Sequence, residues 1–326
     1  PLAVATSVEE LEQKSLEGTI VLLRGDVARE QLMPKNSRFY NPDEHKRIIA
    51  ALEAARPLAI VAATARNPEL AGALYPCPLI EDGDFDIPSV YMTEDEGARL
   101  ARHAGNTVSL DMTAQRLPSS GCNVVARAGG GPRRLVVCAH IDSKGGTPGA
   151  LDNAAGVVTL MLLAELLTGY DGRLGVELVA MNGEDYYASC GEIVYLERNR
   201  DSLTDIVLAI NMDALGQRGG KVAYSYYGCP DALSARVRGV LAAWPQLLEG
   251  EQWYQSDHMV FAMSGCPAMA ITSQHLATIG STISHTERDV PDLVDASLLA
   301  ATAGALHSLL LDLNSMTADS PQGGPQ

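Results

Sequence analysis

The chain has 326 residues, a length typical of about two domains, and 46% of them are hydrophobic. This composition is ordinary for a globular protein and excludes a disordered, collagenous or coiled-coil chain. Acidic residues outnumber basic ones by 40 to 24, so the formal charge is −16. The sign argues against nucleic acid and membrane surfaces as partners, because both are anionic and require a basic surface.

We predict neither a membrane span nor a signal peptide. The most apolar runs, 154–164 and 296–311, fall short of about 18 clean apolar residues, and acidic residues at 9 and 10 precede any long apolar core. The six cysteines are scattered without a CxxC pair, and Cys138 is expected to be a buried free thiol. This usage favours a reducing, cytoplasmic location, with secretion as the alternative if a signal peptide was removed before residue 1.

Residues 1–115 are predicted to form a small α+β domain. Turn signals and apolar runs predict, in chain order, a helix at 7–15, a strand at 19–23, a helix at 41–55, strands at 58–63 and 87–91, a helix at 94–103 and a strand at 107–112. The helix at 41–55 begins with Asn-Pro-Asp-Glu, a capping residue and a proline followed by acids. No group of residues in this part has catalytic spacing.

From about residue 123, strands alternate with helices, which is typical of a layered α/β fold. Strands are expected at 135–139, 174–181, 206–212, 221–226 and 268–272, and helices at 154–167, 232–244 and 296–313. The helix at 154–167 is apolar nearly all round and should be buried against a sheet. We therefore predict a second domain at 116–316 and a disordered tail at 317–326, which lacks core-forming residues.

Histidine and carboxylate residues directly follow three of the predicted strands. In open α/β sheets, ligands bind beyond the carboxyl ends of the strands, so these side chains are expected to meet there. An aspartate at the start of the buried helix and a histidine in a polar loop complete the set. Its members are His140, Asp142, Glu184, Asp185, Asp213, Asp152 and His285. Nitrogen and oxygen ligands without a thiolate suit zinc.

Each member of this set also has an ordinary structural explanation. A histidine after a strand is commonly structural, Asp152 fits a helix N-cap, and Asp213 fits a turn. These explanations do not account for all of the residues together, and the joint pattern favours a metal site. The other histidines have no such context and are interpreted as structural or solvent-facing.

Six motifs follow one another along this part of the chain: AHID (139–142), GALDNAAGV (149–157), NGED (182–185), NMD (211–213), SDHMVF (256–261) and SHTERD (284–289). With them, the segment from Cys122 onward resembles the co-catalytic zinc aminopeptidases of metallopeptidase family twenty-eight. The resemblance implies a three-layer α/β/α sandwich with a mixed central sheet. Upstream, LEGTIVLLRGD (16–26) and IPSVYMTEDEGARL (87–100) resemble a protease-associated insert.

The resemblance implies a zinc-dependent exopeptidase that hydrolyses the N-terminal bond of peptides with a free N-terminus, through a hydroxide that bridges two zinc ions. A cis peptide after the bridging aspartate, between Asp152 and Asn153, is implied as well. The implied ligands are His140 and Asp213 for one ion, Asp185 and His285 for the second, and Asp152 for both.

Further roles follow from the same resemblance. Glu184 is expected to be the general base, which accepts the proton of the attacking water and passes it to the departing amine. Asp142 and Asp289 are expected to orient His140 and His285, respectively, as carboxylates often do for metal-bound imidazoles.

The chain departs from the family pattern at two positions. Asp185 stands where the family usually has glutamate, which shortens the reach of the ligand by one methylene group. Ser284 precedes the last ligand where relatives often have a tyrosine that stabilises the oxyanion. The candidates for that role here are Tyr186, Tyr187, Tyr226 and Tyr254. The run Ser256-Asp257-His258 is interpreted as loop support, because members of a hydrolase triad converge from distant loops.

Two other functions remain as alternatives. HIDSK (140–144) is similar to the early motif of the single-zinc glutaminyl cyclases, which are acyltransferases of the same fold. A non-enzymatic scaffold on a peptidase fold is the third hypothesis, although such decay would remove ligands or the base, and none is missing. The sequence gives no indication of oligomeric state.

Overall fold

The computed structural model describes residues 1–29, 32–33, 41–64, 86–113, 115, 117–185 and 189–319. The chain forms two compact units, of which the first spans Pro1–Ser120 and the second includes Gly121–Asp185 and the chain from Ser189 onward. The first unit therefore ends at residue 120, where the sequence predicted 115. Within the predicted disordered tail, residues 317–319 belong to the last helix, and the remainder lies outside the described residues.

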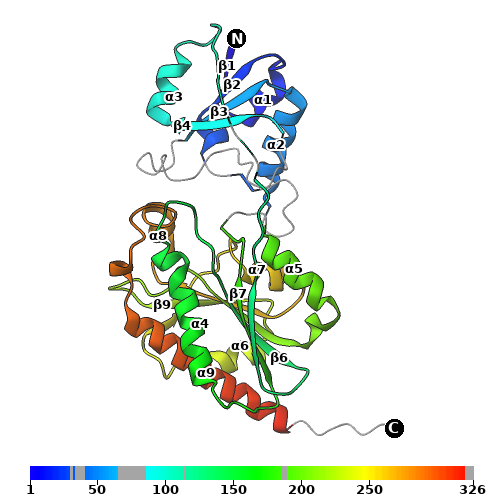
Figure 1. The fold of residues 1–326 in the computed structure, drawn as a ribbon, viewed down its shortest axis with the longest axis vertical. Helices are drawn as coiled ribbons and strands as arrows, with labels where there is room; N and C mark the ends of the chain where they lie inside the picture. The colour runs from blue at the N-terminus through cyan, green and yellow to red at the C-terminus, as the bar shows by residue number, and fades with distance from the viewer. Residues whose placement is uncertain are drawn as a thin grey trace. The chain divides into compact units, whose positions relative to one another are not determined.

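The first unit contains a four-stranded sheet in the order β1-β2-β3-β4, in which every neighbouring pair is parallel. A helix separates the first strand from the second and the second from the third, because parallel neighbours need a crossover between them. This arrangement is α/β and corrects the α+β expectation. The elements are β1 (Leu2–Ala5), α1 (Val8–Gln13), β2 (Ile20–Leu23), α2 (Asp43–Ala55), β3 (Ala59–Thr64), β4 (Ser89–Thr93) and α3 (Glu94–Ala101), as Figure 1 shows.

The strand expected at 107–112 does not form. The backbone of Leu2 in β1 exchanges hydrogen bonds with Gly105 and Asn106, at 2.9 Å each, but no ladder continues beyond them. An alternation of apolar and polar residues predicts a strand only if a partner edge runs alongside it. Conversely, the structure contains a short strand, β1, that was not predicted, because four residues give too little pattern to recognise.

The second unit contains a mixed seven-stranded sheet in the order β10-β9-β11-β8-β6-β7-β5. Its central strands β11, β8, β6 and β7 are parallel, whereas β5 is antiparallel to β7 and β9 is antiparallel to β11. The strands are β5 (Val124–Ala128), β6 (Arg134–His140), β7 (Gly175–Met181), β8 (Ile206–Met212), β9 (Val222–Tyr227), β10 (Leu247–Glu249) and β11 (Ala268–Ser273).

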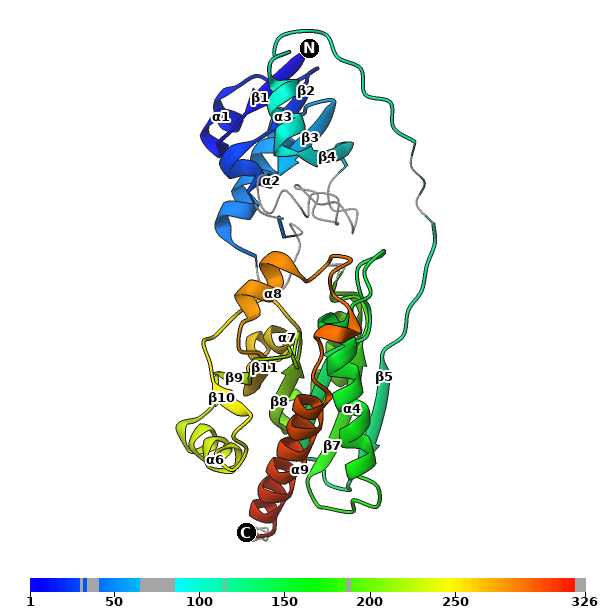
Figure 2. The ribbon, with the colours of Figure 1, turned by 90° about the vertical axis from the view of Figure 1, so that its left-hand side faces the viewer.

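Helices cover both faces of this sheet and confirm the three-layer sandwich (Figures 1 and 2). On one face, Leu135 and Val137 of β6 share a hydrophobic core with α4, α6 and α9. On the other face, Tyr195 of α5 meets Phe261 of α7 edge to face, with ring centroids 5.6 Å apart. The helices are α4 (Ala155–Leu166), α5 (Cys190–Asn199), α6 (Asp231–Leu241), α7 (His258–Met263), α8 (Leu276–Thr282) and α9 (Ala296–Asp319).

Within the described residues, α9 is the one helix whose length and hydropathy would suit a membrane span, over Ala296–Ser315. The apolar stretch of this helix is 56% buried, and the helix packs beside α4 and α6. The core helix of a layered fold meets the same criteria, because it too is apolar over many turns.

Helix α4 begins unusually close to the end of β8. A methyl group built on Gly156 would lie 2.8 Å from the carbonyl oxygen of Met212 and 2.9 Å from the Cβ atom of Ala139, and it would also meet Asn153 Oδ1. Only a residue without a side chain fits there, so Gly156 allows the Asp152 turn to approach the strand ends.

We expect Gly156→Ala to lower the free energy of unfolding by about 1–3 kcal/mol, because the added methyl group overpacks a rigid site. Urea denaturation followed by circular dichroism measures this change. Gly239→Ala in α6 is the matched control, since a methyl group there meets nothing within 4 Å, and it should gain about 0.5–1 kcal/mol. Equal stability of Gly156→Ala and the wild type would contradict the packing argument.

Candidate metal centre

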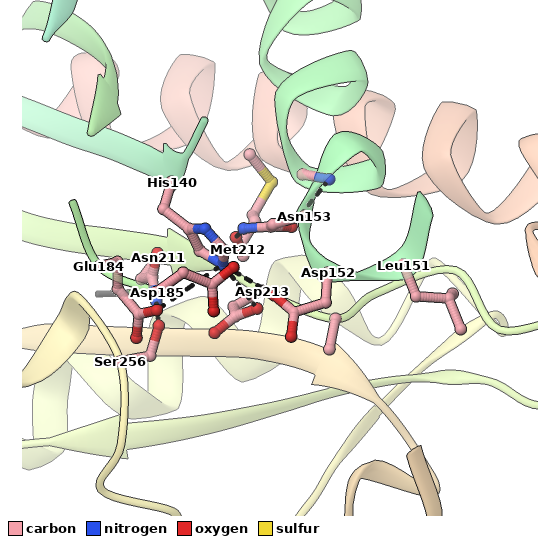
Figure 3. A network of polar contacts seen from close by, with 12 residues as sticks. His140, Leu151, Asp152, Asn153, Glu184, Asp185, Asn211, Met212, Asp213 and Ser256 are labelled. Atoms are coloured by element: carbon pink, nitrogen blue, oxygen red, sulfur yellow. Dashed lines mark hydrogen bonds and ion pairs between the residues drawn. The ribbon is translucent and has the colours of Figure 1, made fainter. Parts of the chain in front are cut away.

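The seven predicted residues come together at the carboxyl edge of three adjacent strands. His140 is the last residue of β6, Asp213 directly follows β8, and Asp185 lies four residues beyond the end of β7. Strand β6 runs between β8 and β7, so the three strand ends are neighbours in the sheet. Figure 3 shows His140, Asp152, Asp185 and Asp213 pointing toward one another.

Two groups of potential ligands share Asp152. Its Oδ1 atom lies 3.0 Å from Nε2 of His140, and its Oδ2 atom lies 3.2 Å from Nε2 of His285. Asp213 Oδ1 is 3.3 Å from the first imidazole nitrogen, and Asp185 Oδ1 is 2.7 Å from the second. In each group the ligand atoms lie within 4.8 Å of one another, a spacing that can hold a metal ion. The geometry thus agrees with the predicted division into two sites with a shared aspartate.

The side chain of Asn153 holds the turn that carries Asp152 to the backbone around it. The peptide bond between Asp152 and Asn153 is cis, as the resemblance implied. Asn153 donates through Nδ2 to the carbonyl oxygen of Met212 at 2.8 Å and accepts through Oδ1 from the backbone N–H of Gly156 at 3.1 Å. Asn153 was not predicted as a site residue, although its place beside the bridging aspartate in the GALDNAAGV motif was a signal.

Asp289 supports the turn that carries the shared aspartate. Its carboxylate accepts hydrogen bonds from the backbone N–H groups of Leu151, at 2.7 Å, and Asp152, at 3.0 Å. It therefore fixes the backbone of the shared aspartate, and its role in orienting His285 stays a prediction. The reason is that the loop carrying Asp289 packs on the Asp152 turn, where two N–H groups need acceptors.

Asp142 likewise supports the backbone more than an imidazole. Its carboxylate accepts from the N–H groups of Gly183 at 2.8 Å, Glu184 at 3.3 Å and Asp185 at 3.1 Å. The carboxylate oxygen lies 3.9 Å from Nδ1 of His140, whereas the backbone oxygen of Asp142 lies only 3.0 Å from that nitrogen. Asp142 thus orients His140 through its carbonyl group and positions the turn of Glu184 through its side chain. A group of His140, Asp142 and Asp185 also has ligand spacing, but these backbone contacts already occupy the Asp142 carboxylate.

Burial and mutual charge shift the protonation of the site. Burial raises the pKa of Glu184 well above its ordinary value, and the Asp213 and Asp185 carboxylates add to this against the opposing effect of His140. Burial works to lower the pKa of His285, but its hydrogen bonds with Asp152 and Asp185 raise it to about 9. Burial also works to lower the pKa of His140, but the negative charge of Asp213 is the largest of several effects that raise it above its ordinary value.

These residues fit a bound metal cation. Asp185 Oδ2 is buried and has no hydrogen-bond partner, so one lone pair of a 1%-exposed carboxylate faces the cluster unused. Carboxylates outnumber the two imidazoles, and a buried excess of negative charge is stabilised by a cation. Nitrogen and oxygen donors of this kind are typical of zinc and similar divalent ions.

The remaining sequence predictions near the site have simple outcomes. Ser256 Oγ accepts from Nδ2 of Asn211 at 2.7 Å, and His258 Nε2 lies 2.8 Å from the Trp253 carbonyl oxygen, contacts of loop support and not of a triad. Cys138 is a buried free thiol, as expected. Among the oxyanion candidates, Tyr254 donates to Gln252. The hydroxyl of Tyr226 is buried without a partner. Tyr186 and Tyr187 lie outside the described residues.

The fold and this cluster define a layered α/β protein with a candidate metal centre at the carboxyl edge of its sheet. A family model described as peptidase family M28 matches residues 123–310, which is more than half of the chain. The chain therefore belongs to peptidase family M28 and is a hydrolase of the peptidase class. The match does not include the first unit, whose resemblance to a protease-associated insert stays a prediction.

Solved structures share the fold at low sequence identity. A zinc aminopeptidase from Bacillus subtilis is 17% identical, with a TM-score of 0.70, over 96% of this chain and 74% of that one. An aminopeptidase from Aneurinibacillus sp. strain AM-1 is 18% identical, with a TM-score of 0.67, over 95% and 73%. A glutaminyl cyclase from Porphyromonas gingivalis is 22% identical, with a TM-score of 0.50, over 59% and 76%. The search of curated proteins found no match.

We expect the chelator-treated protein to lose stability as the pH rises. The pKa of His285 is about 9 in the folded protein and about 6.5 in the unfolded chain. The contribution of this residue to the free energy of unfolding is therefore fully present below about pH 6.5. That contribution is lost as the pH passes through 9. Urea unfolding at intervals from pH 6 to 10 measures the decline, which His285→Gln should flatten. The exposed His103→Gln is the control and should keep it. A wild-type curve that stays level over this range would contradict the assignment.

Proposed function

We propose that this peptidase is an aminopeptidase that holds two zinc ions per chain. The observation that carries the proposal is the sharing of Asp152, whose two carboxylate oxygens face two separate His–Asp groups. His140 and Asp213 would hold one ion and Asp185 and His285 the other, with Asp152 contributing to both. The zinc aminopeptidase from Bacillus subtilis, which has this fold, supports the choice of metal.

Zinc bound there would polarise the scissile carbonyl group and acidify water. Glu184 is the proposed general base: its Oε2 atom lies 4.0 Å from His140 Nε2, at the margin of the cluster and not within it. Burial raises the pKa of Glu184 above its ordinary value and so brings that pKa closer to the operating pH. A base with such a pKa can both accept a proton and return it efficiently. The Asp142 carboxylate fixes the backbone on either side of Glu184 and so keeps the base in place.

The preference for a free N-terminus is argued from charge. Six carboxyl groups surround the site, more than the four positive charges of two zinc ions, so a substrate's α-ammonium group is attracted to it, whereas an acylated amine is not. They are Asp142, Asp152, Glu184, Asp185, Asp213 and Asp289. The single-zinc cyclase is less well supported, because both ligand groups are complete here.

The direct test compares an aminoacyl-p-nitroanilide with its N-acetylated counterpart, using the zinc-loaded protein. We expect cleavage of the free amine only. Release of p-nitroaniline from both compounds at similar rates would reject the exopeptidase assignment. Cyclisation of an N-terminal glutaminyl peptide, without hydrolysis of either anilide, would favour the cyclase.

We expect Glu184→Gln to retain two zinc ions per chain while hydrolysis falls by about 100- to 10,000-fold, the usual contribution of a general base. Elemental analysis of the purified protein gives the metal count, and initial rates on the same anilide give the activity. Glu251→Gln, an exposed position in the described chain, is the matched control. A fully active Glu184→Gln variant would remove Glu184 from this role, and a count of one zinc ion in the wild type would reject the two-metal site.

A further inference from the structure

Two carboxyl groups outside the proposed ligand set are buried within electrostatic range of the metal centre. Glu192 on α5 is 2% exposed, and Asp257, directly before α7, is 0% exposed. Asp257 Oδ1 and Oδ2 and Glu192 Oε2 have no hydrogen-bond donor in the described structure. The two side chains are within hydrogen-bond reach of each other. Neither residue belongs to the proposed ligand set.

Two carboxylates in contact at such depth cannot both be charged. Like charges at hydrogen-bond distance repel strongly in a medium of low dielectric constant, and no described lysine or arginine forms an ion pair with either group. If one group holds a proton, the same two side chains form a strong O–H···O⁻ hydrogen bond. One shared proton thus turns a repulsive contact into an attractive one.

The pair connects two segments that line the metal centre. On the α5 side, the N–H group of Gly191 donates to the carbonyl oxygen of Asn182 at 3.0 Å, two residues before Glu184. On the α7 side, Ser256 accepts from Asn211, which lies two residues before Asp213. A bond between Glu192 and Asp257 therefore ties the turn of the proposed base to the loop that braces the Asp213 strand.

Several titratable groups face the pair from the surrounding elements. Cys138 and His140 are on β6, Asp213 follows β8, Asp142 follows β6, and all four interact electrostatically with one or both carboxyl groups. His258 lies next to Asp257 in the chain, and burial lowers its pKa to about 4, so it is neutral and supplies no charge. His140 is the one cation-forming group among them.

We propose that Glu192 and Asp257 share one proton as a carboxylic acid–carboxylate pair, and that this hydrogen bond fastens the Ser256 loop to α5. Both are then positioning residues for the metal centre. Only the activity test of this role rests on the proposed function. The proton shared by the pair can be tested on the metal-free protein without a substrate.

Infrared spectroscopy at neutral pD detects the C=O stretching band of protonated carboxylic acids. We expect Glu192→Gln and Asp257→Asn each to remove one such band, because an amide N–H then donates to the remaining carboxylate and no proton is needed. Glu197→Gln, an exposed position one turn further along α5, is the matched control and should keep the wild-type spectrum. If either amide variant retains the full wild-type band, the shared proton is refuted.

The position of the loop is read from Trp253, whose backbone N–H group donates to the hydroxyl of Tyr227 at 2.7 Å. Trp244→Phe makes Trp253 the sole tryptophan, since the chain has two. In that background, Glu192→Ala should shift the emission to longer wavelength and increase quenching by iodide, and Glu192→Gln should restore wild-type values. Unchanged emission in Glu192→Ala, with the fold intact by circular dichroism, would overturn the positioning role.

Activity then separates the two proposals. In an active aminopeptidase, Glu192→Ala should lower kcat/KM by about 10- to 100-fold, the usual effect of losing an outer support of a metal site. Glu192→Gln should stay close to the wild type. A protein that passes the infrared and fluorescence tests but hydrolyses no aminoacyl substrate would refute the proposed function and leave the carboxyl pair standing. Full activity in Glu192→Ala would count against the positioning role alone.

Discussion

The carboxylate of Asp152 is the contact on which the rest of the site depends. Its two oxygens face imidazoles from opposite sides, and one imidazole comes from the end of a central strand while the other comes from a loop more than a hundred residues later. To serve both, the carboxylate has to be held at one place and in one orientation. Asp289 does this through the backbone on one side, and Asn153 does it through the strand end on the other. Gly156 lets the helix approach closely enough for both.

Backbone N–H groups hold the supporting carboxylates. Asp142 accepts from three consecutive N–H groups and Asp289 from two. A backbone donor stabilises a buried anion without adding a mobile cation that would compete for the ligands. The excess negative charge of the cluster is therefore preserved, which suits metal ions. Burying these charges is unfavourable for folding by itself, since removal from water costs several kcal/mol per ion unless a partner is present.

Much of the fold could be predicted from local patterns. The central strands are short apolar runs followed by polar residues, and each begins and ends within one or two residues of its expected bounds. Helices α5, α7 and α8 could not be predicted in this way. They have six to ten residues each, and their stability comes from packing, such as Tyr195 against Phe261, more than from their own sequence pattern.

The sequence by itself determined which residues meet at the metal centre, because the order of motifs and the ends of parallel strands place His140, Asp185 and Asp213 at one edge of a sheet. It also showed that each residue expected from the family pattern as a ligand or base has a counterpart in the chain, with aspartate in place of glutamate at position 185. Only the tertiary structure decided what Asp142 and Asp289 hold, since a carboxylate binds whichever donors its loop brings near. The contact of Glu192 with Asp257 was equally hidden, because Glu192 lies on α5 and Asp257 lies 65 positions later, directly before α7. Burial gives the two groups a chemistry that neither has in water.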